Sequence, residues 1–215
     1  MHTYIERDVR RVSDIQNLHA FGNFVRLLAA MSGCEMNYSQ SGRELGVQGA
    51  TAAKWVSVAQ STYQWESIPA FSRNPVKRIA SKPKGYLTDT GFLCHLININ
   101  SPREILHHPS LGALVETYLM NEIIKLVQES QKNMGIYHFR TQRGAEVDCV
   151  IEHDGKVYLI EIKTSSKPTK KHLSGFKSFI ECFPHERVAG KLILCAVEQP
   201  LFLSDDCLAL PWWYM

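Results

Sequence analysis

The chain has 215 residues, of which 45% are hydrophobic and 21% are charged, and its net charge is +3. These proportions are ordinary for a globular protein and exclude disordered and fibrous classes, while the length allows one large core or two modest ones. The six cysteines include no C-x-x-C pair, and no apolar run approaches a membrane span, so we expect reduced thiols, no membrane partner and a cytoplasmic location.

Helices are predicted at three places in the first half of the chain. Apolar residues repeat at helical spacing over residues 18–32. A second helix is predicted from the cap Ser39 to Gly46, and a third over residues 49–61. The short link between the second and third helices predicts a helix-turn-helix.

Two strands follow these helices. Residues 63–68 and 85–88 are the predicted strands, and residues 71–84 form a long turn between them. Three helices and a hairpin predict a winged-helix-like module over residues 1–90. We interpret residues 91–109 as a linker.

Such a module suggests a nucleic-acid partner. The third helix would enter a major groove and present Lys54 to bases or phosphates. The turn has five basic residues and no acidic one between Glu66 and Asp89, a composition suited to phosphate contact on a wing. These five residues are Arg73, Lys77, Arg78, Lys82 and Lys84. A solvated basic loop and a helix-turn-helix that serves only packing explain the same pattern, so DNA contact and scaffold both stay open.

The second half, residues 110–215, is predicted to form an α/β domain. Residues 111–127 are apolar around most of a helix and should be largely buried, which makes Glu116 an expensive residue there. Three strands are predicted over residues 136–141, 146–152 and 157–163. A further amphipathic helix around Phe176 and a strand over residues 191–197 complete the order αβββαβ.

The second and third of these strands are predicted to form a hairpin. Asp154-Gly155 is a strong signal for a two-residue turn, and that turn places Asp148 directly opposite Glu161. Alternation along the strands then predicts an apolar face with Val147, Cys149, Ile151, Tyr158, Ile160 and Ile162. The other face gathers Glu146, Asp148, Glu161 and Lys163 at one end, with Glu146 opposite Lys163.

Two opposed carboxylates destabilise a sheet unless a proton or cation lies between them. A hard divalent cation resolves this conflict, and Mg²⁺ accepts one or two carboxylates together with water and phosphate oxygens. Lys163 would stand beside the metal, orient the attacking water and offset charge on a phosphodiester. The predicted chemistry is phosphodiester hydrolysis with Asp148 and Glu161 as metal ligands. The alternative is a polar sheet end held by salt bridges.

Asp148, followed after twelve residues by Glu161-Ile162-Lys163, resembles the motif of the PD-(D/E)XK, or restriction-endonuclease-like, superfamily. Support comes from the hairpin register, the preceding helix with Glu116 and the following helix and strand. Val147 stands where the superfamily name records a proline, a position that carries no chemistry. The resemblance implies a nuclease-like fold, with Glu116 as a further ligand or water anchor. The alternative for Glu116 is a salt bridge with Arg140 or Lys163.

A resemblance that covers almost the whole chain is to the C-terminal region, of unknown function, of prokaryotic AAA+ type ATPases. It implies an ATPase domain or subunit as a partner, yet this chain has no G-x-x-x-x-G-K-[ST] loop and cannot hydrolyse ATP by that route. An excised piece, a split gene and a decayed remnant all fit this absence. The phrases that carry the resemblance are Tyr4-Ile5-Glu6-Arg7-Asp8-Val9, Asn37-Tyr38-Ser39, Tyr86-Leu87-Thr88-Asp89-Thr90-Gly91, Leu114-Val115-Glu116, Arg140-Thr141, Gly144-Ala145-Glu146-Val147-Asp148 and Ile160-Glu161-Ile162-Lys163-Thr164.

Three functions therefore remain after the sequence is read. The first is a Mg²⁺-dependent nuclease associated with DNA. The second is a catalytically silent module that holds nucleic acid for an ATPase, and the third is a protein-interaction module. Two further residue patterns have simple structural interpretations: Asp89 is predicted to cap a helix, and Trp212-Trp213-Tyr214 to close the edge of the core.

Overall fold

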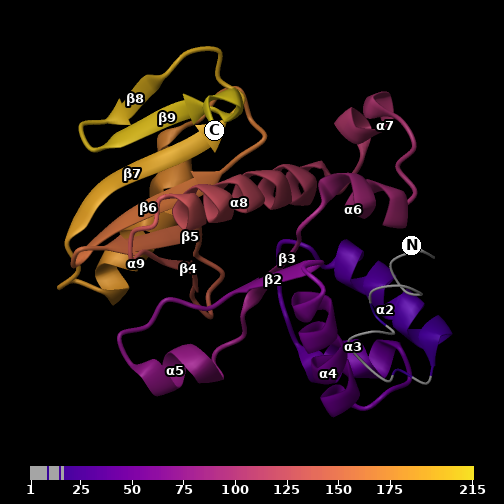
Figure 1. Ribbon diagram of the computed structural model, residues 1–215. Coiled ribbons are helices and arrows are strands. Elements are labelled where there is room, and N and C mark those ends of the chain that lie inside the picture. The colour runs from indigo at the N-terminus through magenta and orange to yellow at the C-terminus, as the bar shows by residue number, and fades with distance from the viewer. Residues whose placement is uncertain (1–8, 10–14, 16) are drawn as a thin grey trace. The chain divides into compact units, whose positions relative to one another are not determined.

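The computed structural model describes Val9, Ile15 and residues 17–215, and the chain divides into two compact units (Figure 1). The first unit holds residues up to Ser67 together with Lys82–Thr117. The second unit holds Ile68–Ser81 and Tyr118–Met215. Helices and strands occur in both units, which confirms the predicted mixed α/β class.

Three helices of the first unit lie close to where the apolar spacing predicts them. They are α2 (Leu18–Ala30), α3 (Tyr38–Glu44) and α4 (Gly49–Ser61). The Asn17 side chain accepts a hydrogen bond from the Ala20 amide, and the Asn37 side chain accepts one from the Gln40 amide. The cap of α3 is therefore Asn37 rather than the predicted Ser39, because its carbonyl oxygen reaches a free amide of the first turn.

Aromatic side chains from α2 and α4 form the centre of the first core. Phe21 and Phe24 are fully buried, and their ring centroids lie 5.8 and 5.4 Å from that of Trp55. Their edge-to-face arrangement is the one that ring quadrupoles favour. The unit also contains a small sheet of order β1-β3-β2, formed by β1 (Cys34–Glu35), β2 (Trp65–Ile68) and β3 (Lys84–Leu87).

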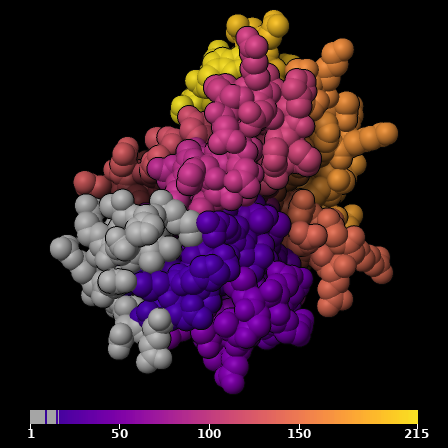
Figure 2. All heavy atoms as spheres, turned by 90° about the vertical axis from the view of Figure 1, so that its right-hand side faces the viewer, coloured from indigo at the N-terminus to yellow at the C-terminus, as the bar shows by residue number. Residues whose placement is uncertain are grey.

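The predicted linker over residues 91–109 is largely helical in the structure. Leu93, Leu96 and Ile99 are buried in the first core, because the first of the linker's two short helices and the residues after it turn their apolar side chains inward. The Asp89 side chain accepts a hydrogen bond from an amide of the first helical turn, which confirms the predicted cap. These helices are α6 (Thr90–Leu96) and α7 (Pro102–His107); α6 packs on α2, where Figure 2 shows magenta atoms against indigo ones.

The long turn predicted over residues 71–84 also contains a helix, and its segment Ile68–Ser81 packs as part of the second unit. Asn74 caps this helix, since its side chain accepts two amides of the first turn. Phe71 is buried in the second core, and its amide donates to the His138 carbonyl at 2.7 Å. The helix is α5 (Pro75–Ala80). The segment is therefore not a wing on the first unit but a covering piece of the second.

The second unit contains the predicted order αβββαβ. Its elements are α8 (Leu111–Glu129), which begins in the first unit, then β4 (Gly135–Arg140), β5 (Glu146–His153), β6 (Lys156–Ile162), η2 (Lys170–Leu173), α9 (Ser174–Cys182) and β7 (Val188–Cys195). Two strands and a short turn of helix follow: β8 (Leu201–Ser204), β9 (Cys207–Pro211) and η3 (Trp212–Tyr214). None of the helices formed by described residues is long and apolar enough to cross a membrane.

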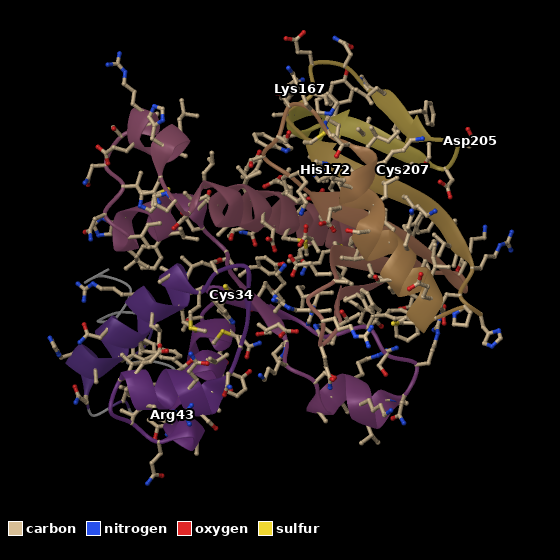
Figure 3. All side chains as sticks on the ribbon, turned by 180° about the vertical axis from the view of Figure 1, so that it is seen from behind. Cys34, Arg43, Lys167, His172, Asp205 and Cys207 are labelled. Carbon is tan, nitrogen blue, oxygen red and sulfur yellow. The ribbon has the colours of Figure 1, made fainter. Side chains whose placement is uncertain are left out.

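The six strands of this unit form one sheet of order β4-β5-β6-β7-β9-β8. β6, β7 and β9 run parallel to one another, while β4, β5 and β6 are antiparallel in turn. α8 and α9 lie on opposite faces of the sheet, as the two views in Figures 1 and 3 show. Phe176 and Phe179 of α9 are fully buried against the sheet. Because the parallel strands end at the same edge, the residues that follow them meet there.

Candidate metal and phosphodiester site

The hairpin of β5 and β6 has the predicted register. Cys149 pairs with Ile160, and His153 pairs with Lys156 across the turn. The turn itself is Asp154-Gly155, and both residues have the positive φ values of 48° and 68° that such a two-residue turn requires. The ladder ends at the pair of Cys149 and Ile160. The residues that precede Cys149 and follow Ile160 are therefore not held together by main-chain pairing.

A β-bulge lies where this ladder ends. On the other side of β5, Tyr137 pairs with Val150 but Phe139 pairs with Val147, so two residues of β5 oppose one residue of β4. Val147 and Val150 consequently pack in the same core beneath α9. The predicted alternation, which places Val147 on the face of Cys149, is wrong at this point because the extra residue changes the parity of the strand.

Asp148 lies in the bulge, and its carboxylate accepts a hydrogen bond from a β6 amide in place of a main-chain carbonyl of β5. Its Oδ2 accepts a hydrogen bond from the Ile162 amide at 2.9 Å. Lys163 Nζ lies 2.6 Å from Glu161 Oε1 and 3.9 Å from Asp148 Oδ2. Asp148 is 2% exposed and Glu161 5%, whereas 31% of the Lys163 side chain is exposed. The structure thus brings three predicted site residues together at a point that opens to solvent beside the lysine.

Glu146 is engaged differently from the prediction. It pairs in register with Arg140 of β4, and their side chains form an ion pair of 3.2 Å. The predicted opposition of Glu146 and Lys163 falls beyond the last paired residues of β5 and β6. The Lys163 ammonium instead lies beside the carboxylates of Asp148 and Glu161.

Burial and crowding of like charges dominate the electrostatics of the site. Burial of Glu161 and the neighbouring Asp148 carboxylate raise the pKa of Glu161 to about 8, although Lys163 acts in the opposite direction. Burial alone would lower the pKa of Lys163, but the Glu161 and Asp148 carboxylates outweigh that effect and raise it. Glu161 therefore takes up a proton more readily than an exposed carboxyl group, and Lys163 keeps its charge.

The donor set fits a hard cation. Glu161 Oε2 is buried and has no hydrogen-bond partner among the described residues, so one carboxylate oxygen is available to a ligand. In the part of the chain that the structure describes, no group of three His, Cys, Asp or Glu side chains is placed to hold a metal ion. A structural zinc site needs four protein ligands. Mg²⁺ binds through one or two carboxylates and keeps several waters, which matches Asp148 and Glu161.

The raised pKa of Glu161 predicts a pH dependence of stability. The folded-state pKa of about 8 lies above the ordinary value of 4.5, so this carboxyl favours the folded state fully below pH 4.5. Its contribution is lost as the pH rises through about 8. We expect the free energy of unfolding to fall over this window in the wild type, and to fall much less in Glu161→Gln. Urea denaturation at several pH values measures the difference.

Mg²⁺ provides the matched control for this prediction. A cation competes with the proton on Glu161, so Mg²⁺ should stabilise the wild type more at pH 8 than at pH 5. Calorimetric titration in buffers of different ionisation enthalpy should also show release of a proton near pH 7. Equal pH slopes in the wild type and in Glu161→Gln would contradict the assignment.

Glu116, the fourth predicted site residue, lies in the first unit and has partners there. Lys84 Nζ lies 2.7 Å from Glu116 Oε1, and the Tyr86 hydroxyl donates to the same oxygen at 2.7 Å. Only 6% of the Lys84 side chain and 17% of the Glu116 side chain are exposed. The ion pair and the hydrogen bond join the start of α8 to β3.

These contacts predict that Glu116 matters for stability rather than for metal affinity. Breaking a buried ion pair from one side costs about 3 to 5 kcal/mol, because the other charge stays buried. We expect Glu116→Ala to lower the unfolding free energy by roughly 3 kcal/mol, with no change in Mg²⁺ affinity. Glu116→Gln, which keeps an acceptor for Tyr86, should lose less stability. Weaker Mg²⁺ binding by a fully stable Glu116→Gln would instead make Glu116 a ligand.

The candidate nucleic-acid residues are divided between the two units. Arg73 bridges Glu152 and Glu186, and its guanidinium carbon lies 5.3 Å from the centroid of the Phe71 ring. Arg78 donates to the Ser72 carbonyl and stacks on the Tyr137 ring. These two arginines hold Ile68–Ser81 on the second unit.

The other four candidates differ in exposure. Lys84 is buried against Glu116, so it is not available to phosphate. Lys54, Lys77 and Lys82 are exposed. Lys77 belongs to the second unit and the other two to the first. Sequence reasoning missed these internal roles because the acidic partners and Tyr137 lie far away in the sequence.

Comparisons with known proteins match both halves of the chain. Residues 1–103 match a family model described as a domain of unknown function (DUF8612), and residues 111–215 match another domain of unknown function (DUF4143). Uncharacterized proteins of Mycobacterium bovis and Mycobacterium tuberculosis are each 26% identical over 209 residues. The alignments cover 97% of this chain but 45% of each relative, so the chain spans just under half their length. No solved structure matches the chain.

Proposed function

We propose that the second unit is a Mg²⁺-dependent phosphodiesterase of the nuclease type. The observation that carries the proposal is the buried Glu161 carboxylate beside Asp148, with one oxygen unpartnered and with Lys163 at 2.6 Å from the other. Two carboxylates and a lysine at the end of a split hairpin are the groups that hydrolysis of a phosphodiester needs. The resemblance to the PD-(D/E)XK motif supports the same reaction.

Each residue has a separate role in this proposal. Asp148 and Glu161 would hold the cation, and Asp148 is oriented for this by the Ile162 amide. When bound, Mg²⁺ supplies Lewis-acid polarisation of a phosphoryl oxygen and acidifies a coordinated water. The Lys163 ammonium positions the attacking water and offsets negative charge that develops on the phosphate. Its partial exposure allows a substrate phosphate to approach it.

We further propose that this activity serves an AAA+ type ATPase. Support comes from the resemblance to the C-terminal regions of such ATPases, and the curated relatives are about twice as long as the matched segment. The ATPase domain would supply movement along nucleic acid, and the second unit would supply cleavage. Co-purification of this chain with an ATPase domain tests the proposal. Deletion of the unit that binds the ATPase domain should abolish the co-purification.

The experiment that tests the site is a titration of Mg²⁺ into wild type, Asp148→Asn and Asp154→Asn. Asp148→Asn keeps an acceptor for the Ile162 amide, so the fold is retained while a ligand charge is lost. Asp154→Asn removes an exposed carboxylate from the hairpin turn and is the matched control. We expect Mg²⁺ binding to fall only in Asp148→Asn. Cleavage of single- and double-stranded DNA and RNA should be lost in the same variant alone.

The alternative is a catalytically silent module, and one observation favours it. Lys163 Nζ already pairs with Glu161 at 2.6 Å and lies 3.9 Å from Asp148 without a metal, as in a structural salt-bridge cluster. Mg²⁺ binding without cleavage of any of the four substrates would support this alternative. Absence of Mg²⁺ binding that depends on Asp148 would exclude both the metal site and the nuclease.

A further inference from the structure

The segment that follows β6 is tied to the segments that follow β7 and β9. The Ala196 amide donates to the Ser165 carbonyl at 3.1 Å, and Pro211 pairs with Cys195 at the ends of their strands. The Trp212 indole nitrogen donates to the Lys163 carbonyl at 3.0 Å. These contacts fix η3 directly beside the candidate catalytic lysine.

Only the first aromatic residue of η3 is used for this attachment. Trp212 is half-buried, whereas Trp213 is 60% exposed and Tyr214 is 55% exposed. The prediction that the aromatic run closes the core edge therefore fits Trp212 and not its two neighbours. Large aromatic side chains that stay exposed beside a charged site are the groups that dominate binding surfaces.

Positive charge follows Lys163 along the same loop. The Lys167 amide donates to the Ser165 hydroxyl at 3.0 Å, and the Lys167 side chain is exposed. Figure 3 shows Lys167 at one end of β8 and β9, and Asp205 in the turn at their other end. The acidic turn is thus kept away from the edge that carries Lys163, Lys167 and the exposed aromatic residues. This edge suits a ligand with flat rings and negative charge.

We propose that Trp213, Tyr214 and Lys167 form the binding platform for single-stranded nucleic acid at the phosphodiesterase site. This inference rests on the proposed function and names its substrate class. Unpaired bases stack on exposed aromatic rings regardless of sequence, and lysines beside the rings attract the phosphates. In a duplex the faces of the bases are covered by their neighbours, so a duplex cannot use Trp213 and Tyr214 in this way.

The test is binding of fluorescently labelled oligo(dT) and oligo(U) of about 20 nucleotides in EDTA, measured by anisotropy. Trp213→Ala is expected to weaken the Kd about 10-fold or more, and Trp213→Phe to restore most of the affinity. Tyr63→Ala removes an aromatic side chain that is 84% exposed in the first unit, and should leave the Kd unchanged. A duplex of the same length should bind more weakly, without dependence on Trp213.

The salt dependence tests the lysine separately. Lys167→Gln should reduce the slope of log K against log salt by about 0.7, the value for one phosphate contact on a single strand. Lys132→Gln, which removes an exposed lysine from the turn before β4, is the matched control. The DNA and RNA arms identify which single strand is preferred.

Binding in EDTA is independent of catalysis, so the two proposals fail differently. If Trp213→Ala binds single strands as well as the wild type, the platform is wrong even where Mg²⁺-dependent cleavage occurs. If binding depends on Trp213 and Lys167 but no cleavage is found, the platform stands and the nuclease activity does not. Loss of affinity in Tyr63→Ala equal to that in Trp213→Ala would also overturn the platform.

Discussion

Replacement of Lys163 by alanine is expected to reduce Mg²⁺-dependent cleavage at least about 100-fold, the effect of removing one preorganised donor from a site where charge develops. Lys163 Nζ lies within 4 Å of a carboxylate oxygen of both Asp148 and Glu161. Without it, the site loses the ammonium group that would offset charge on the phosphate. Single-turnover cleavage with saturating Mg²⁺ measures this loss in the chemical step.

Mg²⁺ affinity separates a catalytic role of Lys163 from a structural one. The ammonium competes with Mg²⁺ for the Glu161 carboxylate, so Lys163→Ala should bind Mg²⁺ at least as tightly as the wild type. Lys177→Ala removes an exposed lysine from α9 and should change neither cleavage nor affinity. Undiminished cleavage by Lys163→Ala would reduce the lysine to a counter-ion of the buried carboxylates.

The register of the β5–β6 hairpin could be predicted, because neighbouring residues in the sequence determine it. Asp154-Gly155 specifies a tight turn, and a tight turn fixes which residues of two adjoining strands face one another. The turn therefore predicts the register from the pair of Cys149 and Ile160 to the pair of His153 and Lys156, which the structure has, whereas Asp148 and Glu161 lie just beyond the last pair. The bulge at Asp148 could not be predicted, because Cys149, Val150 and Ile151 are apolar in succession and the pattern does not fix which of them shares a face with Val147.

Contacts between distant residues explain the other differences. Lys84 lies in a segment whose composition is that of a basic loop. It is nevertheless buried, because the fold places Glu116 next to it. Arg73 likewise meets Glu186 only after the second unit has formed. The helix α5 had a local signal, Asn74 before Pro75, which is a common helix start. Its packing on the second core had none.

Gly175 provides a second large expected effect, because α9 approaches β5 most closely there. A β-carbon at Gly175 would lie 1.9 Å from the Glu146 carbonyl oxygen and 3.0 Å from its carbon, which are main-chain atoms. Either α9 or β5 must move, and the movement disturbs the packing of Phe176 beneath the sheet. We expect Gly175→Ala to lower the unfolding free energy by about 3 kcal/mol. Since Glu146 precedes Asp148 by two residues, Mg²⁺ affinity should fall as well.

Gly112 is the matched control, because it is the second residue of α8 as Gly175 is the second residue of α9. A β-carbon at Gly112 would meet no atom within 4 Å. Alanine is preferred over glycine in helices by up to about 1 kcal/mol, so Gly112→Ala should be neutral or stabilising. Urea denaturation gives the two free energies, and hydrogen exchange in β5 and β6 locates the loss. If both variants gain stability alike, the close approach of α9 to the Glu146 carbonyl does not position Asp148.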